Sequence, residues 1–218
     1  MEIGELVGVG RMADVYAAGE GRVLRRYRDG FDATGEVAVM GYLREWGYPV
    51  PEVWGGEAAS ELVMERLEGR TMLAALAEGA VTAEWAGEVL AELLGRLHGI
   101  PARESTDPRH RVLHMDLHPD NVFLTPAGPV VIDWGTAIDG PPGLDSAMSV
   151  LILAQAAVTM PEIAEIARPG LAALLRALGG TEGLLLTEAK ARRAANPTLS
   201  AAEIGKLDEA LALIAELA

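Results

Sequence analysis

Three residues with oxygen-bearing side chains stand at fixed spacings in the middle of the sequence. Asp116 and Asn121 are five positions apart in HMDLHPDNVFL, and Asp133 follows in VVIDWG, 17 positions after Asp116. Phosphoryl transfer needs an acceptor hydroxyl held in line, and divalent metal ions that neutralise the charge of the phosphates. An aspartate beside the hydroxyl can take its proton, while an asparagine and a second aspartate supply hard oxygen ligands for Mg²⁺. The spacing therefore predicts phosphoryl-transfer chemistry.

The motif pair H-x-D-x-x-x-x-N and I-D-W-G resembles the catalytic and metal-binding loops of a known family. This family is the aminoglycoside phosphotransferase and choline kinase group of the protein-kinase-like superfamily, and the resemblance extends over residues 4 to about 155. It implies that Asp116 is the catalytic base and that Asn121 and Asp133 bind magnesium. It also implies that His114 braces the loop. The alternative is two ordinary turns, which would have to match the motif by chance.

A glycine-rich segment, VGVGRMADVY, lies near the start of the chain. A G-x-G turn between two strands lets the backbone approach phosphates closely. The segment resembles the nucleotide-covering loop of kinases, since no G-K-[ST] follows as in a Walker loop. The resemblance implies that Gly8 and Gly10 lie over the phosphates and that Val15 packs on the adenine, while Ala13 replaces a third glycine. A plain hairpin turn is the alternative.

The next strand, VLRRY, carries arginines where kinases place a phosphate-binding lysine. Side chains alternate across a strand, so Arg25 aligns with that lysine and Arg26 points to the opposite face. The resemblance implies that Glu36, in the following helix, pairs with Arg25. Arginine binds phosphate bidentately but is bulkier than lysine. A solvated pair of arginines on an exposed strand is the alternative.

The segment ELVMERLEG, residues 61–69, resembles the hinge that binds the adenine edge in this family. The resemblance implies that Met64 lines the back of the pocket. It also implies that the backbone carbonyl of Glu65 and the backbone amide of Leu67 bind the base. The implied cofactors are ATP or GTP as phosphate donor, together with Mg²⁺.

Two further positions match the family pattern. Asp145, in PPGLDSAM, matches an aspartate that follows the metal-binding loop, although simple helix capping explains it equally well. His98, in LGRLHGI, matches a Leu-His pair at a helix end and is expected to be structural.

The pattern of apolar residues predicts an α+β, protein-kinase-like, two-lobed fold. Residues 1–68 read as short strands with one helix and form the expected nucleotide-binding lobe. Residues 69–218 read mostly as helices and form the expected catalytic and acceptor-binding lobe. Thr82 is expected to cap a helix with Trp85 on its apolar face. Breaks in the C-terminal helices are expected at prolines, Pro169 among them, and Ser200 is expected to cap the final helix.

Composition limits the partners and the compartment. The net charge of −14 disfavours nucleic acid and anionic lipid. The negative charge would suit a cationic small-molecule acceptor. The alternative is that it only keeps the protein in solution. The absence of cysteine fits a reducing cytoplasm. The 13-residue apolar stretch Met148–Met160 is short for a membrane span, and no signal peptide is visible. We therefore expect a cytoplasmic protein without a membrane partner, and leave its oligomeric state open.

Two alternatives to a small-molecule phosphotransferase remain open at this point. A small protein kinase is disfavoured because the stretch from Asp133 to Asp145 is short and no A-P-E signature follows. A nucleotide-binding module without catalysis is favoured by the missing lysine and disfavoured by the intact Asp116, Asn121 and Asp133. The sequence does not identify the acceptor, which could be aminoglycoside-like, an amino alcohol or a sugar.

Overall fold

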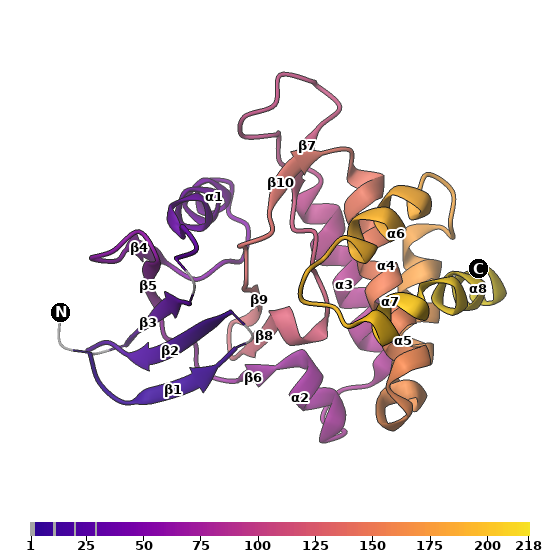
Figure 1. Ribbon diagram of the computed structural model, residues 1–218, viewed down its shortest axis with the longest axis horizontal. Coiled ribbons are helices and arrows are strands. Elements are labelled where there is room, and N and C mark those ends of the chain that lie inside the picture. The colour runs from indigo at the N-terminus through magenta and orange to yellow at the C-terminus, as the bar shows by residue number, and fades with distance from the viewer. Residues whose placement is uncertain (1–2, 11, 20, 29) are drawn as a thin grey trace. The chain divides into compact units, whose positions relative to one another are not determined.

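The described residues form two compact units, each with its own core. The first comprises the chain up to Arg70 together with Phe123–Ala137, and the second comprises Thr71–Val122 and Ile138–Ala218. Figure 1 shows the computed structural model, which describes residues 3–10, 12–19, 21–28 and 30–218.

The stretch Phe123–Ala137 was expected in the C-terminal lobe, but the structure assigns it to the first unit. The amide of Val131 donates a hydrogen bond to the carbonyl of Pro49 at 2.8 Å. The buried Trp134 ring packs edge-on against Tyr48, with ring centroids 5.7 Å apart. Local strand spacing gives no sign of these contacts, because their partners lie more than 80 residues earlier in the chain.

The first unit is built on an antiparallel sheet with strand order β1-β2-β3-β5-β4. Its strands are β1 (Leu6–Val9), β2 (Ala13–Ala17), β3 (Arg22–Tyr27), β4 (Val53–Gly55) and β5 (Glu61–Glu65). Along β3 the side chains alternate between two faces. Tyr27 packs on one face with Ala33 and Leu62, and Leu24 packs on the other with Val63.

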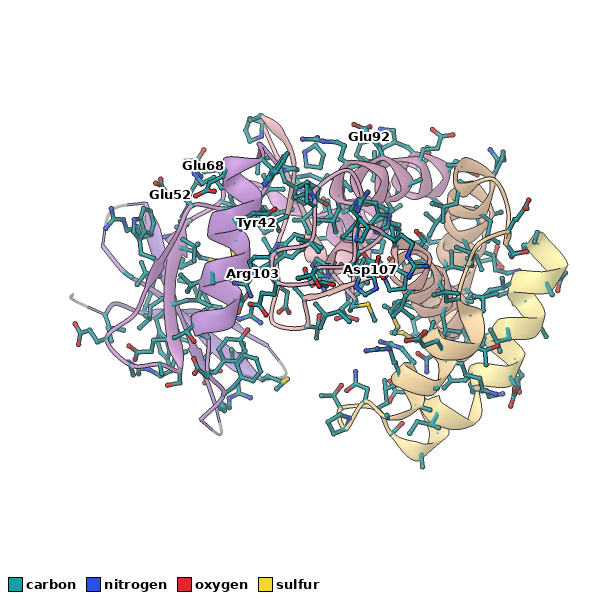
Figure 2. All side chains as sticks on the ribbon, turned by 90° about the horizontal axis from the view of Figure 1, so that it is seen from above. Tyr42, Glu52, Glu68, Glu92, Arg103 and Asp107 are labelled. Carbon is teal, nitrogen blue, oxygen red and sulfur yellow. The ribbon has the colours of Figure 1, made fainter. Side chains whose placement is uncertain are left out.

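Helix α1 (Thr34–Glu45) belongs to the same unit and carries Tyr42, labelled in Figure 2. Its buried residues follow helical spacing and include one charged side chain. They are Glu36, Val39, Met40 and Leu43. Burying a carboxylate is costly unless it is paired, so we expect polar partners around the Glu36 side chain.

Two smaller sheets flank the motif loops. In one, β7 (Arg111–Leu113) pairs with β10 (Ile138–Gly140), both in the second unit. In the other, the order is β6 (Arg70–Thr71), β8 (Val122–Thr125) and β9 (Gly128–Val131). The segment from His114 to Leu117 is a loop between β7 and the short 3₁₀ helix η1 (Pro119–Asn121).

The second unit is mainly helical. Its central helix, α4, is buried on all sides from Leu144 to Gln155 and packs against α5, α6 and α8. The helices of this unit are α2 (Met72–Ala77), α3 (Ala83–Leu97), α4 (Pro142–Thr159), α5 (Pro161–Leu178), α6 (Leu186–Ala194), α7 (Ala201–Gly205) and α8 (Leu207–Leu217).

By length and composition, α4 is the one helix among the described residues that could cross a membrane. However, 67% of it is buried inside the structure. A core helix passes the same test of length and composition, so this feature is weak evidence for a membrane span.

Three expectations about the helices need correction. Thr82 does cap α3, but Trp85 is 39% exposed and the buried face runs through Leu90, Leu94 and Leu97. Pro169 lies inside α5 rather than breaking it. Ser200 caps the short α7 in a capping box, and the last helix, α8, begins separately at Leu207.

Helices α3 and α5 approach closely at two glycines, which gives a stability prediction. A Cβ at Gly87 would lie 2.3 Å from the carbonyl oxygen of Gly170 and 2.8 Å from the amide nitrogen of Leu174. Because these are backbone atoms, Gly87→Ala is expected to lower the free energy of unfolding by roughly 1–3 kcal/mol. Urea unfolding followed by circular dichroism measures it.

The matched control is Gly95→Ala in the same helix. A Cβ at Gly95 would meet no heavy atom within 4 Å, and this residue is exposed. Alanine is the better helix former by about 0.8–1 kcal/mol, so this variant should be as stable as the parent or more so. Equal effects of the two substitutions would contradict the close packing.

Candidate active site

In the first unit, Arg25 lies at the centre of a charged cluster. Its guanidinium donates to the Glu36 carboxylate at 3.1 Å and to the Asp133 carboxylate at 2.7 Å. Tyr27 donates to Glu36 at 2.5 Å, as does the backbone amide of Trp134 at 3.1 Å. Charge-assisted bonds of this kind are about twice as strong as neutral ones. The predicted ion pair between Arg25 and Glu36 is confirmed.

Burial governs the protonation of this cluster. Burial raises the pKa of Glu36, and the charge of Arg25 offsets part of that rise. Burial lowers the pKa of Arg25, but the charges of Asp133 and Glu36 outweigh burial and raise it overall. Burial also raises the pKa of the Tyr27 hydroxyl, which therefore stays protonated as a donor. The cluster is therefore held by a permanently charged guanidinium.

Arg26 takes the opposite face of the sheet, as the strand alternation predicts. Its guanidinium pairs with Glu61 at 2.8 Å and lies over the Tyr16 ring, 5.5 Å from the centroid. The side chain is 42% exposed. Only Arg25 of the two is therefore directed at Glu36 and Asp133.

Several implied nucleotide-binding residues share the face of Arg25. Directly opposed residues in an antiparallel pair point to the same side. Val15 is opposite Arg25, Gly8 is opposite Val15, and Met64 is opposite Val23, a residue on the same face as Arg25. Their implied contacts with a nucleotide stay predictions.

The remaining three implied nucleotide-binding residues lie at the ends of strands or after them. The Gly10 amide donates to the Ala13 carbonyl at 2.8 Å, closing the turn between β1 and β2. Glu65 ends β5 and its amide donates to the Glu52 carbonyl at 2.9 Å, while Leu67 follows the strand. The implied roles of Gly10, Glu65 and Leu67 stay predictions.

In the second unit, the loop after β7 positions Asp116 and Asn121. The Asn121 side-chain nitrogen donates to the backbone carbonyl of Asp116 at 2.9 Å. The Asp116 amide donates to Nδ1 of the fully buried His114 at 3.2 Å. These bonds fix the loop from both sides, as expected of His114.

His118 adds a second contact to Asp116. Its Nδ1 accepts the amide of Asp120 at 3.3 Å, and its Nε2 lies 3.7 Å from Oδ2 of Asp116 and 3.3 Å from the side-chain nitrogen of Asn121. Burial raises the pKa of Asp116, but the contact with His118 and the charges nearby outweigh burial and lower it. Asp116 is therefore ionised at neutral pH, as a proton acceptor must be.

Backbone strain coincides with both motif loops. Met115 has φ of 68° and Asp133 has φ of 66°, and they are the two non-glycine residues with positive φ among those the structure describes. Such conformations cost of order 1–3 kcal/mol and persist where surrounding contacts hold them. The strain lies next to Asp116 in one loop and on Asp133 itself in the other.

Asp145 supplies the contacts that hold the strained loop. Its carboxylate accepts the amides of Met115 at 2.7 Å and His114 at 3.1 Å, and it contacts Nε2 of His98 at 3.0 Å. The side chain is fully buried, and α4 has no side-chain cap. Simple helix capping, which the sequence left open, is therefore not what Asp145 does; it anchors the loop instead.

The anchoring role of Asp145 predicts a loss of stability in Asp145→Asn. An amide offers one acceptor oxygen instead of two, so at least one buried backbone N–H loses its partner. A buried unsatisfied donor costs roughly 1–3 kcal/mol, and this loss should appear in urea unfolding.

The matched control is Asp139→Asn. Asp139 also accepts backbone amides, those of Arg103, Glu104 and Ser105. However, Arg103 and Glu104 are exposed, so water can replace the lost bond; Figure 2 labels Arg103 in this loop. A loss as large for Asp139→Asn as for Asp145→Asn would argue against a special role for burial.

Sequence reasoning missed Arg193, which lies beside Asp116, and Gln155, which orients Arg193. Arg193 of α6 places a guanidinium nitrogen 3.5 Å from Oδ1 of Asp116, and Gln155 of α4 accepts from the same side chain at 2.8 Å. The only sequence signal was a glutamine within an apolar run, which marks a buried polar group in need of a partner.

Asn121 and Asp133 offer oxygens that suit Mg²⁺. Because Asn121 donates its nitrogen to the Asp116 carbonyl, its amide oxygen faces away from that bond. Arg25 binds one oxygen of Asp133, and the carboxylate is 40% exposed. The described residues hold no cluster of three or more typical metal ligands. Mg²⁺ does not need one, since one or two protein oxygens plus phosphates and water suffice.

Comparisons with known proteins give a family and a fold. The family described as the phosphotransferase enzyme family matches residues 4–111 and 102–186. No curated protein matches the sequence significantly.

Solved aminoglycoside phosphotransferases share the fold. ADP-bound APH(2'')-Ib aligns over 100% of this chain and 94% of its own, with a TM-score of 0.61 and 13% identity. The gentamicin complex of APH(2")-IIa aligns over 99% and 90%, with a TM-score of 0.63 and 13% identity. Its streptomycin-ATP complex gives a TM-score of 0.59 over 100% and 93%, at 13% identity. The expected α+β, protein-kinase-like fold is confirmed.

Proposed function

Because the chain belongs to the phosphotransferase enzyme family, we propose that it moves the γ-phosphoryl group of ATP or GTP to a hydroxyl of a small molecule. The observation that carries this proposal is the ionised Asp116, held at its amide by His114 and at its carbonyl by Asn121. A carboxylate fixed in this way is suited to accept a proton from an alcohol.

In the proposed reaction, Asp116 orients the acceptor hydroxyl and takes its proton as the hydroxyl oxygen bonds to the γ-phosphorus. The bond from that phosphorus to the bridging oxygen breaks, and the nucleoside diphosphate leaves. Asn121 and Asp133 would hold Mg²⁺, which supplies charge neutralisation on the phosphates. Arg25 would bind the phosphates, and Glu36 fixes its orientation.

A small-molecule acceptor is the version that the comparisons favour. The solved relatives are described with streptomycin and gentamicin, and with ADP and ATP. These ligands support an alcohol acceptor and a nucleotide donor here. A protein kinase is the competing function, and a cytoplasmic location without nucleic-acid or membrane partners is part of the proposal.

The first test is nucleotide binding with and without magnesium. Calorimetry with ATP and with GTP is expected to show at least about tenfold tighter binding when Mg²⁺ is present, because the metal joins phosphate oxygens to protein oxygens. Asn121→Ala should reduce this difference. Asp120→Ala, an exposed neighbour in the same loop, should leave it unchanged.

The outcomes separate the competing functions. Equal affinity with and without Mg²⁺, or no nucleotide binding, would contradict the proposed metal and donor sites. Transfer to a protein, without transfer to aminoglycosides, choline, sugars or nucleosides, would favour a protein kinase.

A further inference from the structure

Arg193 reaches the candidate catalytic aspartate from the C-terminal helices. It lies in the last turn of α6, and its side chain is only 14% exposed. Its Nε donates to Oε1 of Gln155 at 2.8 Å, and its Nη1 lies 3.5 Å from Oδ1 of Asp116. All three residues belong to the second unit, so their arrangement is internal to that unit.

The orientation of Gln155 is itself fixed. Its side-chain nitrogen donates to the backbone carbonyl of Glu203 at 2.9 Å, so the amide oxygen faces Arg193. The glutamine is only 3% exposed, which leaves little room for another rotamer. A buried hydrogen-bond acceptor thus holds the guanidinium in one orientation, as supporting hydrogen bonds do for the side chains of precise binding sites.

The contact with Asp116 bears on whether a substrate anion can bind here, since the adjacent Arg192 is paired with Glu188 at 3.1 Å. The contact between Arg193 and Asp116 is long for a charge-assisted bond, which is normally about 2.7–2.9 Å. An anion that bonds more closely can therefore compete for the guanidinium.

Resting on the proposed function, we propose that Arg193 binds a carboxylate of the acceptor, beside the hydroxyl that Asp116 activates. One guanidinium matches the single negative charge of a carboxylate, and its planar donors fit it bidentately. Arg193 would also offset the repulsion between that carboxylate and Asp116. Since the two binding atoms are 3.5 Å apart, the acceptor carries its hydroxyl and carboxylate close together.

The proposal reverses the expectation drawn from the net charge of −14. That charge is spread over the whole chain and mainly affects solubility and encounter. A cationic acceptor would bring its ammonium group against a fixed guanidinium at the point of reaction. The substrate class inferred is therefore a short hydroxy acid rather than an aminoglycoside or an amino alcohol.

Three matched probes test this inference: glycerate, glycerol and 3-amino-1,2-propanediol. They share a three-carbon diol and differ in a carboxylate, a neutral and an ammonium group. With ATP and Mg²⁺, kcat/KM is expected to be highest for glycerate and lowest for the amine. Arg193→Gln should lower kcat/KM for glycerate by at least about tenfold, mainly through KM, and should not lower it for the amine.

Arg193→Lys should restore part of the preference for glycerate. Arg192→Gln, one position away and 48% exposed, is the control and should change none of the three values. If Arg193 only stabilises the packing of α6 on α4, Arg193→Gln would lower the melting temperature and reduce kcat/KM for all three probes by the same factor. Equal scaling, or a preference for the amine in the parent, would overturn the inference.

A binding measurement keeps the test independent of catalysis. Without nucleotide, millimolar glycerate should raise the melting temperature of the parent and of Arg192→Gln, but not of Arg193→Gln. No shift in the parent, or equal shifts in all three proteins, would overturn the carboxylate site. Failure of nucleotide binding would instead overturn the proposed function, so the two failures are distinguishable.

Discussion

Replacing Asp116 with asparagine is expected to lower turnover by roughly 10²-fold or more, while nucleotide affinity stays nearly unchanged. The amide keeps the size of the side chain and one oxygen, so the loop contacts of Asn121 and His114, which use the backbone of Asp116, survive. What is lost is a group that can take the hydroxyl proton. The measurement is phosphoryl transfer to an identified acceptor, together with calorimetry of the nucleotide.

Asp120→Asn is the matched control for this prediction. Asp120 lies in the same loop and is exposed, so its replacement should change turnover little. Unchanged turnover in Asp116→Asn would remove Asp116 from the catalytic step. A parallel loss of nucleotide affinity would show that the substitution disturbs the loop rather than the chemistry.

Replacing Arg25 with alanine is expected to weaken both nucleotide binding and the first unit. Removing a charged hydrogen bond to the phosphates should cost roughly 1.5–3 kcal/mol of binding free energy. The substitution also leaves Glu36, whose side chain is 1% exposed, without its cationic partner. Breaking a buried pair in this way costs about 3–5 kcal/mol of stability.

Arg26→Ala is the control on the same strand. Its ion pair with Glu61 lies on the other face and is 42% exposed on the arginine side, so its loss should cost only about 0–1 kcal/mol of stability and little nucleotide affinity. Calorimetry with ATP and GTP at fixed salt, and urea unfolding of each variant, give the two quantities.

A second variant separates binding from folding. Arg25→Lys keeps a cation beside Glu36 and should fold. It lacks the second guanidinium nitrogen, which donates to Asp133. A larger loss of nucleotide affinity for Arg26→Ala than for Arg25→Ala would reverse the strand register. No loss for either would mean that the glycine-rich turn and the metal hold the phosphates.

The sequence by itself determined those features that depend on short-range pattern. The spacing of Asp116, Asn121 and Asp133 on two consecutive loops predicted phosphoryl-transfer chemistry, and the resemblance of these motifs to a known family predicted the family. The alternation of side chains along one strand separated Arg25 from Arg26, since a strand has a period of two residues. Both are local rules that hold before the chain folds.

Only the tertiary structure decided what surrounds the catalytic loop. Asp145 anchors the strained Met115 from 30 positions away, and Arg193 approaches Asp116 from 77 positions away. Periodicity marks which face of a helix is buried but not which loop that face meets, so a buried aspartate resembles a helix cap and an arginine resembles a solvated charge. The packing of α4 and α6 brings these groups together, and their pairing is favoured because an unpaired buried polar group costs free energy.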